Sequence, residues 1–414
     1  MPEPPDLSRP LDIPKTAAEL GLMVGVPPAE GGQVTLSNWQ EPPFSRWGFQ
    51  HVRDLIPTAR IGIGGPVREF DRAERDLSGV AFEVAGREVP FEQWLGETAT
   101  DGLLVLHRGR LVYERYLNGM RPDSRHLLMS VSKSVCSTVI GSLVDEGRLD
   151  PQDLVTAHIP ELGGSSFDGC TVRDLLDMRA GTKFDEDYDN PDADVRVYEQ
   201  IYQWRPRTDT DLPGSITDYY ATLENDGPHN GAFRYRSILT DLLGWVAERA
   251  GGERLAELIS TRIWQPMGAE YDADVTVDGY GNAMADGGVC TTLRDLARFG
   301  QTMLEGGRGH NGTVVSQAWI DDVLSSPADV VEVFAESEDV HEHPPGAYYR
   351  SKWWVMEAAR PLYAGLGING QMVMIDGATQ SVIAKFSTWP EPWSAERFAL
   401  TIAGCRQLLA LLDV

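Results

Sequence analysis

The sequence has no long apolar run and few cysteines. No segment of its 414 residues approaches the ~20 consecutive apolar residues of a membrane-spanning helix, and the N-terminus lacks the basic start and apolar run of an export signal. The four cysteines, Cys136, Cys170, Cys290 and Cys405, have no paired spacing, which predicts buried free thiols rather than a disulfide framework or a zinc site. These absences predict a soluble protein of the cytoplasm with no membrane partner.

Basic residues are also scarce. Lysine and arginine together number 36 against 62 acidic residues, which gives a net charge of -26. Such a surface repels nucleic acid and anionic lipid, so a polyanionic partner is not expected. The excess of acid is interpreted as a device for solubility, with attraction of a cationic substrate as the alternative.

The apolar pattern predicts a hairpin, several helices and a group of late strands. Residues 103–116 are expected to form two strands around a turn at Arg108-Gly109. Elsewhere, helical spacing of apolar residues predicts helices and short apolar runs near turns predict strands. The helices are expected at residues 130–146, 238–250, 292–304 and 395–412, and the strands at 352–357, 372–375 and 381–387.

A chain of this length is expected to divide into two lobes, because single cores stop growing at about 250 to 300 residues. Strands at both ends with helices between them predict one sheet built from both ends, carrying an inserted helical lobe. The α/β lobe is expected to comprise residues 1–160 and 271–414, with 1–60 largely an extended wrap over the surface. Residues 161–270 are expected to form the mainly helical lobe, with the active site in the cleft between the lobes.

The segment Ser130-Val131-Ser132-Lys133 is an S-x-x-K tetrapeptide, the nucleophile motif of serine β-lactamases and penicillin-binding proteins. Residues i and i+3 of a helix are neighbours, so Lys133 is expected to reach Ser130 Oγ, while the helix N-terminus offers a backbone N–H to a developing oxyanion. Burial is expected to lower the pKa of Lys133, so that the neutral amine accepts the serine proton. The motif predicts Ser130 as covalent nucleophile and Lys133 as its base.

Tyr235-Arg236-Ser237 supplies the second expected element, a tyrosine followed two residues later by serine. A phenol between the lysine and the scissile nitrogen can pass a proton to the leaving amine, which needs an acid because an amide ion is a poor leaving group. The alternative for Tyr235 is a half-buried packing tyrosine.

Six short segments carry a resemblance to a known family. They are Trp39-Gln40-Glu41-Pro42-Pro43, His126-Leu127-Leu128-Met129-Ser130-Val131-Ser132-Lys133-Ser134, Glu186-Asp187-Tyr188, Gly287-Gly288-Val289, Gly370-Gln371 and Ser387-Thr388-Trp389-Pro390. In these segments the sequence resembles the 6-aminohexanoate-dimer hydrolases, which cleave linear nylon oligomers and belong to the class C β-lactamase-like enzymes.

The resemblance implies a serine β-lactamase-like α/β fold, with an antiparallel sheet flanked by helices and an inserted all-α lobe. It implies an acyl-enzyme route that uses Ser130, Lys133 and Tyr235, with no metal and no cofactor. It further implies that Tyr188 lies over the substrate amide. The glycine-rich segment at residues 365–368 stands where related β-lactamases carry Lys-Thr-Gly, which makes the backbone N–H of Ile368 the second oxyanion donor, beside that of Ser130.

Three positions depart from the family pattern. Glu199 stands where the efficient nylon-oligomer enzyme has an aspartate that meets the substrate ammonium, Asp286 replaces asparagine or histidine, and Asn369 replaces a histidine. Glu199 and Asp286 are therefore candidate ligands of a substrate ammonium, against the alternative that each is a solvated carboxylate.

Rival motifs are incomplete. No serine lies in G-x-S-x-G, and His341-Glu342-His343 lacks the spacing of a zinc protease and is interpreted as a solvated loop. Gly62-Ile63-Gly64-Gly65 is only a fragment of a dinucleotide-binding fingerprint and is set aside.

The expected function is hydrolysis of linear 6-aminohexanoate amides, with carboxylesterase activity on short acyl esters. The partner is then a small amide or ester substrate. The alternatives are a carboxylesterase of unknown natural substrate, a β-lactamase or D-amino-acid peptidase, and a non-catalytic protein that kept the fold. The oligomeric state stays open, with a homodimer as one alternative.

Overall fold

Seven antiparallel strands form the central sheet of the protein. The computed structural model describes residues 5–413. In spatial order the strands are β5 (Arg110–Tyr116), β4 (Thr100–His107), β13 (Ser381–Ser387), β12 (Gln371–Asp376), β11 (Leu362–Gly367), β10 (Trp353–Glu357) and β9 (Tyr348–Arg350). Because β4 pairs directly with β13, the sheet joins early and late parts of the chain, as predicted.

The β4–β5 hairpin confirms the strand prediction for residues 103–116. Its turn residues Arg108 and Gly109 both have positive φ, 49° and 73°. This is the conformation of the two-residue turns that match the twist of a hairpin. The two turn residues therefore determine this hairpin, which forms one edge of the sheet.

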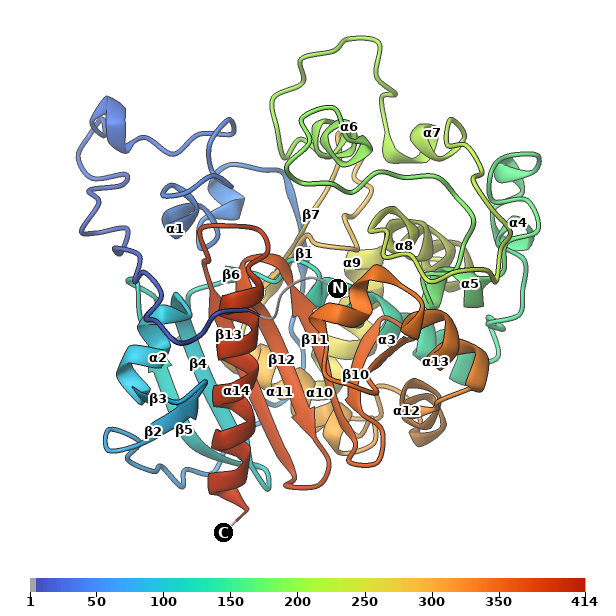
Figure 1. Cartoon of the computed structure of the whole chain (residues 1–414). Coiled ribbons are helices and arrows are strands. Elements are labelled where there is room, and N and C mark those ends of the chain that lie inside the picture. Colours follow the sequence, from blue (N-terminus) through green and yellow to red (C-terminus); the bar gives the residue numbers. More distant parts are fainter. Residues whose placement is uncertain (1–4, 414) are drawn as a thin grey trace.

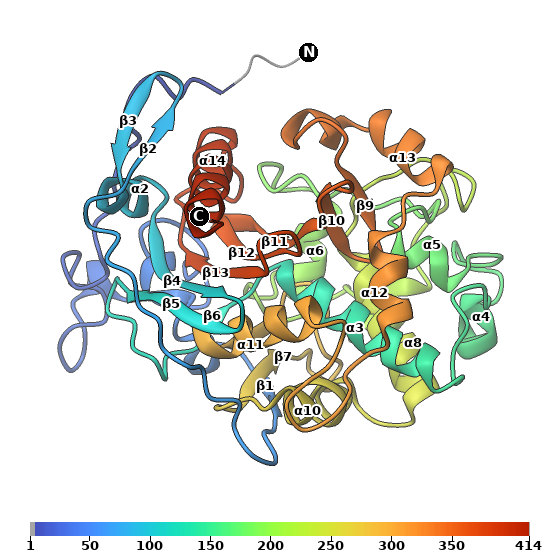
Figure 2. The same ribbon diagram turned by 90° about the horizontal axis from the view of Figure 1, so that it is seen from below.

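Helices cover both faces of the sheet (Figures 1 and 2). Helix α14 (Ala395–Leu412) lies along one face, and α11 (Leu293–Leu304) and α3 (Val131–Asp145) lie on the other. Every residue of α3 from 131 to 143 is buried. The helix packs against β11, where a Cβ on Gly365 would lie 2.9 Å from Ser134 Oγ. A small residue in β11 thus allows the close approach of α3.

The middle of the chain is helical, and most of its helices lie to the upper right of the sheet in Figure 1. Among the described residues, no strand occurs between residues 161 and 270. The predicted helix near residue 238 is α8, which ends at Gly252 in the left-handed conformation. The helices of this part are α5 (Val172–Leu176), α6 (Asp194–Ile201), α7 (Ile216–Tyr220), α8 (Ile238–Gly251), α9 (Leu255–Ile259), η4 (Ser260–Trp264) and α10 (Gln265–Met267).

Two small sheets were not predicted. One contains β1 (Thr58–Ile61), β7 (Ala273–Thr276), β8 (Val289–Thr291) and β6 (His126–Leu127), and the other pairs β2 (Ala81–Val84) with β3 (Arg87–Pro90). Strands of two to four residues are too short for a visible alternation of apolar and polar side chains. Their positions depend on partners far along the chain.

Short helices and turns complete the structure. All four cysteines are free and buried, as expected. Among the described helices, none has the length and apolar character needed to cross a membrane. The remaining helices are η1 (Glu30–Gly32), α1 (Ser45–Gly48), η2 (Val52–Asp54), α2 (Phe91–Glu97), α4 (Val155–His158), η3 (Pro160–Leu162), α12 (Gln317–Leu324), α13 (Ala328–Ala335), η5 (Glu338–Glu342) and η6 (Ile368–Gly370).

Candidate active site

A cleft of about 360 Å³ brings together residues from the start of α3, from strands β10 and β11 and from the helical middle of the chain. Four of the predicted site residues line it: Ser130, Tyr188, Tyr235 and Ile368. Lys133 lies beneath them and is 1% exposed. The other lining residues are Glu186, Asp339, Glu342, His343, Trp354, Leu366, Gly367 and Trp393.

Ser130 is the residue that caps the N-terminus of α3. The preceding Met129 has a φ of 47°, a conformation that is rare for a side chain of this kind and that turns the chain sharply from β6 into α3. This turn leaves Ser130 half-buried at the cleft while the following turns of α3 are fully buried. The nucleophile candidate is therefore accessible on a rigid element.

Lys133 forms the hydrogen bonds that a serine-activating amine needs. Its Nζ lies 2.8 Å from Ser130 Oγ, 2.9 Å from Ser237 Oγ and 3.3 Å from an Asp286 carboxylate oxygen. The Ser237 hydroxyl donates its only proton to Glu186, and the Asp286 carboxylate can only accept. A neutral amine can satisfy Ser237 and Asp286 with its two protons and still offer its lone pair to the Ser130 hydroxyl.

The predicted direction of the Lys133 pKa is wrong. Burial by itself lowers the pKa of this amine, but Tyr235, Asp286 and Glu186 together outweigh burial, and the Lys133 pKa lies above its ordinary value. The expectation of a lowered pKa takes account of burial alone, whereas the charged groups that the fold brings to Lys133 come from distant parts of the chain. Lys133 is consequently an ammonium in the resting site, and its proton must move before it can act as a base.

Tyr235 faces Ser130 and Lys133 from the segment before α8. Its ring stacks on Trp354 at 5.6 Å, and Lys133 Nζ lies 5.0 Å from the ring centre. Burial raises the pKa of the Tyr235 phenol, although Lys133 and hydrogen bonding to Ser130 act in the opposite direction. The phenol therefore keeps its proton at neutral pH and can donate it.

Glu186 is a site residue to which the sequence reasoning gave no role, although its tripeptide was noted. Its two carboxylate oxygens each lie 2.5 Å from Ser237, one from the backbone nitrogen and the other from Oγ. The Tyr188 hydroxyl donates to the same carboxylate at 3.1 Å. Burial raises the Glu186 pKa despite the opposing charge of Lys133. A proton acceptor thus stands one hydroxyl away from the lysine.

Asp286 does not line the cleft, contrary to the role predicted for it. It is 5% exposed, and its carboxylate contacts Lys133 and accepts from the Tyr198 hydroxyl at 2.6 Å. The Tyr198 hydroxyl also lies within hydrogen-bonding distance of Asp241, whose pKa is raised by burial and by the charge of Asp286. Asp286 belongs to a buried network beneath the amine, where a substrate ammonium would have to displace Lys133.

Glu199 is likewise turned away from the cleft. It is 3% exposed and forms ion pairs with Arg196 at 2.7 Å and Arg205 at 2.5 Å. Two arginines already neutralise its single charge. The geometry therefore gives no support to the prediction that Glu199 meets a substrate ammonium.

We accordingly expect Glu199→Gln to act on stability rather than on recognition of charge. Leaving Arg196 and Arg205 without their shared carboxylate is expected to cost about 1 to 3 kcal/mol of unfolding free energy, because Arg205 remains partly exposed. Denaturant unfolding measures the cost, and the hydrolysis of a neutral and of a cationic ester should change by the same factor. A selective increase of KM for the cationic ester would restore the ammonium role.

Backbone from β11 approaches the nucleophile closely. A Cβ on Gly367 would lie 2.9 Å from the Ser130 backbone nitrogen and 2.7 Å from the Leu128 carbonyl oxygen, so only glycine fits. Ile368 follows directly and lines the same cleft. The neighbouring Asn369, with a φ of 57°, is buried, and its side-chain amide donates to the Trp389 carbonyl at 2.9 Å. Asn369 thus fixes this backbone instead of facing substrate.

The prediction of a solvated loop at residues 341–343 is wrong for His343 alone, because His341 and Glu342 are exposed. Glu342 and His343 line the cleft, and the His343 ring is stacked on Trp354 at 4.0 Å. His343 is 9% exposed. No sequence pattern predicts this placement, because it depends on the contact of His343 with Trp354 in β10. Among residues 5–413 no group of His, Cys, Asp and Glu is arranged to hold a metal ion.

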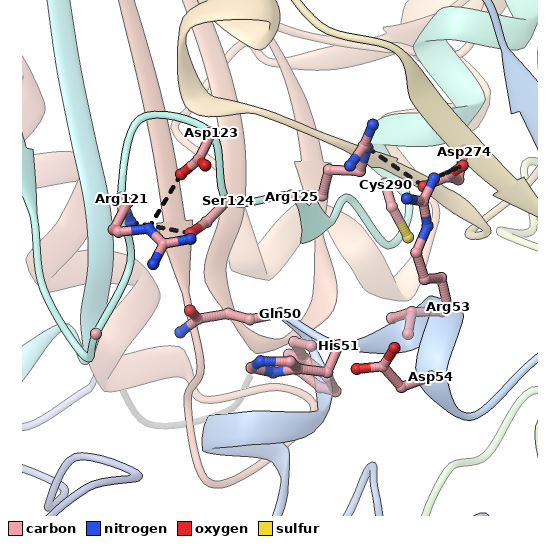
Figure 3. A pocket seen from close by; sticks show the side chains of 13 residues that line it. Gln50, His51, Arg53, Asp54, Arg121, Asp123, Ser124, Arg125, Asp274 and Cys290 are labelled. Atoms are coloured by element: carbon pink, nitrogen blue, oxygen red, sulfur yellow. Dashed lines mark hydrogen bonds and ion pairs between the residues drawn. The ribbon is translucent and has the colours of Figure 1, made fainter.

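A second cavity, of about 320 Å³, contains none of the predicted site residues (Figure 3). It carries three arginines, and each of them contacts an aspartate. Arg53 and Arg125 both reach Asp274, at 2.6 and 3.3 Å, and Arg121 reaches Asp123 at 3.2 Å. No arginine is left over to attract an anion, so the catalytic candidate remains the first cleft.

An antiparallel sheet flanked by helices, with serine and lysine on the first turn of a buried helix and a tyrosine opposite, is the arrangement of the β-lactamase-like serine hydrolases. The chain belongs to the beta-lactamase family, whose model matches residues 91–403. The fold predicted from the sequence is thereby confirmed.

The chain is similar to the 6-aminohexanoate-dimer hydrolase of Paenarthrobacter ureafaciens, with 42% identity over 366 residues, 88% of this chain and 91% of the relative. Esterase EstB of Burkholderia gladioli is 28% identical over 205 residues, 45% of this chain and 51% of that enzyme. A solved structure assigned as a 6-aminohexanoate-dimer hydrolase from Bacillus anthracis gives a TM-score of 0.82 with 26% identity, covering 93% of this chain and 98% of that one. The resemblance inferred from six segments is confirmed.

Proposed function

We propose that the protein is a serine hydrolase that cleaves linear amides of 6-aminohexanoate through an acyl-enzyme on Ser130, and that the same site hydrolyses short acyl esters. The observation that carries the proposal is the contact of 2.8 Å between Lys133 Nζ and Ser130 Oγ at the floor of a cleft lined by Tyr235. The similarity to a 6-aminohexanoate-dimer hydrolase over 88% of the chain supports the substrate class.

The first step of the proposed mechanism moves a proton away from Lys133. The ammonium donates to Ser237 Oγ at 2.9 Å, and Ser237 donates to Glu186 at 2.5 Å, which is a continuous relay. Burial favours the protonated form of Glu186. A proton that passes along the relay leaves a neutral Lys133 facing Ser130.

Acylation then uses groups that already surround the serine. Ser130 Oγ attacks the amide carbon while its proton passes to Lys133, and the negative oxygen of the intermediate faces the backbone N–H groups of Ser130 and Ile368. The C–N bond breaks as Tyr235 gives its proton to the leaving amine and recovers one from Lys133. Water subsequently attacks the acyl-enzyme, which releases the acid and regenerates Ser130.

The walls of the cleft support the proposed division into lobes. Tyr188 and Tyr235 come from residues 161–270, whereas Ser130, Trp354 and Ile368 come from the two flanking stretches. Tyr188 is proposed to contact the substrate amide. Buried free thiols are consistent with the proposed cytoplasmic location. A homodimer is left as a proposal that a native mass measurement tests.

A carboxylesterase is the second candidate, because part of the chain is similar to esterase EstB. Esters have better leaving groups than amides, so a site that acylates on an amide should acylate on a small ester, while the converse can fail. A β-lactamase or D-amino-acid peptidase is less well supported, since residues 365–368 contain no lysine to meet a substrate carboxylate. Comparing the linear 6-aminohexanoate dimer with short nitrophenyl esters and a chromogenic cephalosporin decides among them.

Labelling with a fluorophosphonate tests the proposal against a non-catalytic protein. A serine hydrolase is expected to be labelled once, at Ser130, and the Ser130→Ala variant not at all. Absence of labelling on the wild type, together with no turnover of any of these substrates, would leave the non-catalytic reading.

Tyr235→Phe is expected to slow amide hydrolysis by ~10²-fold or more and nitrophenyl ester hydrolysis by less than ~10-fold. The reason is that a nitrophenolate leaves without a proton, whereas an amine does not. The measurement is kcat/KM on both substrates. Tyr363→Phe is the matched control, because this buried tyrosine of β11 has a hydroxyl without a partner among the described residues. Equal losses on the two substrates would remove Tyr235 from the leaving-group role.

A further inference from the structure

One wall of the cleft carries two carboxylates that have no counter-charge. Asp339 and Glu342 both lie in η5 and line the cavity that contains Ser130. Residues i and i+3 of a 3₁₀ helix point in the same direction. Among residues 5–413, no lysine or arginine forms an ion pair with either of them. A molecule bound in the cleft would therefore meet these two carboxyl groups.

His343, the next residue, adds an unused hydrogen-bond acceptor. Its Nδ1 lies 3.1 Å from the Asp339 backbone carbonyl, which can only accept, so Nδ1 carries the proton and Nε2 the lone pair. Nε2 has no partner among the described residues, although His343 is only 9% exposed and lines the cleft. Burial lowers the pKa of His343 to about 4, which keeps the ring neutral and accepting at pH 7.

Aromatic rings connect this wall to the catalytic tyrosine. His343 stacks on Trp354 at 4.0 Å, and Trp354 stacks on Tyr235 at 5.6 Å. Trp393 lines the same cavity. The faces of such rings attract cations and pack against methylene groups. The stacked rings of Tyr235, Trp354 and His343 thus form an apolar surface between the nucleophile and the wall that carries Asp339 and Glu342.

The other carboxylates near the cleft are already engaged. Glu199 is paired with two arginines, Asp286 with Lys133, and Glu186 with Ser237. In contrast, burial raises the pKa of Asp339, and partial burial together with the charge of Asp339 raises that of Glu342 to about 7 against the opposing effect of the Trp393 indole N–H. Glu342 is exposed to solvent. Both shifts are those of carboxylates that lack a neighbouring cation.

We propose that Asp339, Glu342 and His343 form a subsite for the terminal primary ammonium of an ω-amino acyl chain whose carbonyl lies at Ser130. With both carboxyl groups ionised, the three side chains offer three acceptors and no donor, the complement of an ammonium, which has three donors and no acceptor; a bound ammonium itself favours the ionised forms. An aminohexanoyl chain has as many backbone bonds as two α-residues and spans about 7 Å when extended. Along the stacked rings the centre of Trp354 lies 5.6 Å from that of Tyr235, and the centre of His343 lies 4.0 Å from that of Trp354, distances on the scale of such a chain. The inference rests on the proposed acyl transfer at Ser130.

The test compares two esters that differ only at the chain end. Nitrophenyl 6-aminohexanoate carries an ammonium where nitrophenyl heptanoate carries a methyl group, and both are activated, so amidase activity is not needed. In the variant D339N/E342Q we expect kcat/KM for the cationic ester to fall at least ~10-fold more than for the neutral ester, mainly through KM. His343→Phe keeps the stacked ring and should lower the same ratio by a smaller factor.

The matched control is Glu338→Gln, which removes a charge from the same segment at an exposed position outside the cleft. Its ratio of the two esters should stay at the wild-type value. Equal losses on both esters in D339N/E342Q, or an equal fall of the ratio in the control, would overturn the subsite.

A binding measurement separates failure of the subsite from failure of the proposed function. Calorimetric titration of 6-aminohexanamide into the Ser130→Ala variant should give binding that weakens at least ~10-fold when D339N/E342Q is added. If the wild type hydrolyses neither ester, the proposed function fails, and this titration alone decides the subsite. Unchanged binding of the amide in the combined variant would overturn it.

Discussion

Ser130→Ala is expected to reduce the hydrolysis of both amides and esters by at least ~10³-fold. The substitution removes the hydroxyl that lines the cleft 2.8 Å from Lys133 Nζ, so no acyl-enzyme can form at this position. What remains is binding and the backbone donors, which by themselves give a small part of the catalysis of such sites. Steady-state kinetics on the 6-aminohexanoate dimer and on a nitrophenyl ester measures the loss.

The acyl-enzyme supplies an independent readout for this variant. Intact-mass measurement after rapid quenching should show one added acyl group on the wild type and none on Ser130→Ala. Ser142→Ala is the control, because Ser142 lies on the same helix and donates to the Val139 carbonyl at 2.7 Å, away from the cleft. Turnover of Ser130→Ala within tenfold of the wild type would rule out Ser130 as nucleophile.

The elements predicted correctly are those whose signals are local. The turn at Arg108-Gly109 needs two residues with positive φ, and the last helix, residues 395–412, has the bounds that its apolar spacing indicates. The tetrapeptide at Ser130 fixes serine and lysine on one helical turn, so their contact of 2.8 Å follows from helix geometry. In each case the controlling residues are neighbours in the sequence.

The features that were missed depend on contacts between distant segments. Asp286 lies 153 residues from Lys133, and together with Tyr235 and Glu186 it reverses the direction of the Lys133 pKa shift. Glu199 is paired with Arg196, an i,i+3 neighbour on the same helix that the sequence spacing indicates. It is also paired with Arg205, whose position the sequence does not predict because it depends on the path of a loop. His343 faces the cleft because it stacks on Trp354. The residue types in the sequence therefore predict the catalytic residues, but they do not predict the distribution of charge around those residues.

Lys133→Met is expected to be nearly as damaging as the loss of the nucleophile, with a decrease of ~10³-fold or more on both ester and amide. Methionine fills the space of the buried lysine without a group that can take the Ser130 proton. Lys385→Met is the matched control, because Lys385 is also fully buried, lies in β13, and has a pKa of about 7 lowered by burial. This control is expected to lose stability, but acylation of Ser130 should proceed. Retention of turnover in Lys133→Met would contradict the role of the amine.

Relative to the wild type, Lys133→Met is expected to become less stable as the pH rises. This direction identifies the groups around Lys133 as carboxyl groups. Burial raises the pKa of Glu186 above its ordinary value of 4.5, and removal of the lysine removes the charge that opposes this increase. Stability from a carboxyl with a raised folded-state pKa is fully present below about 4.5 and is lost as the pH rises through that raised pKa. The wild-type ammonium, whose pKa is raised, stabilises the fold throughout this range. The difference in unfolding free energy between wild type and variant should therefore grow from pH 5 to pH 8, reaching about 3 kcal/mol. A difference that stays constant with pH would mean that Lys133 contributes packing alone.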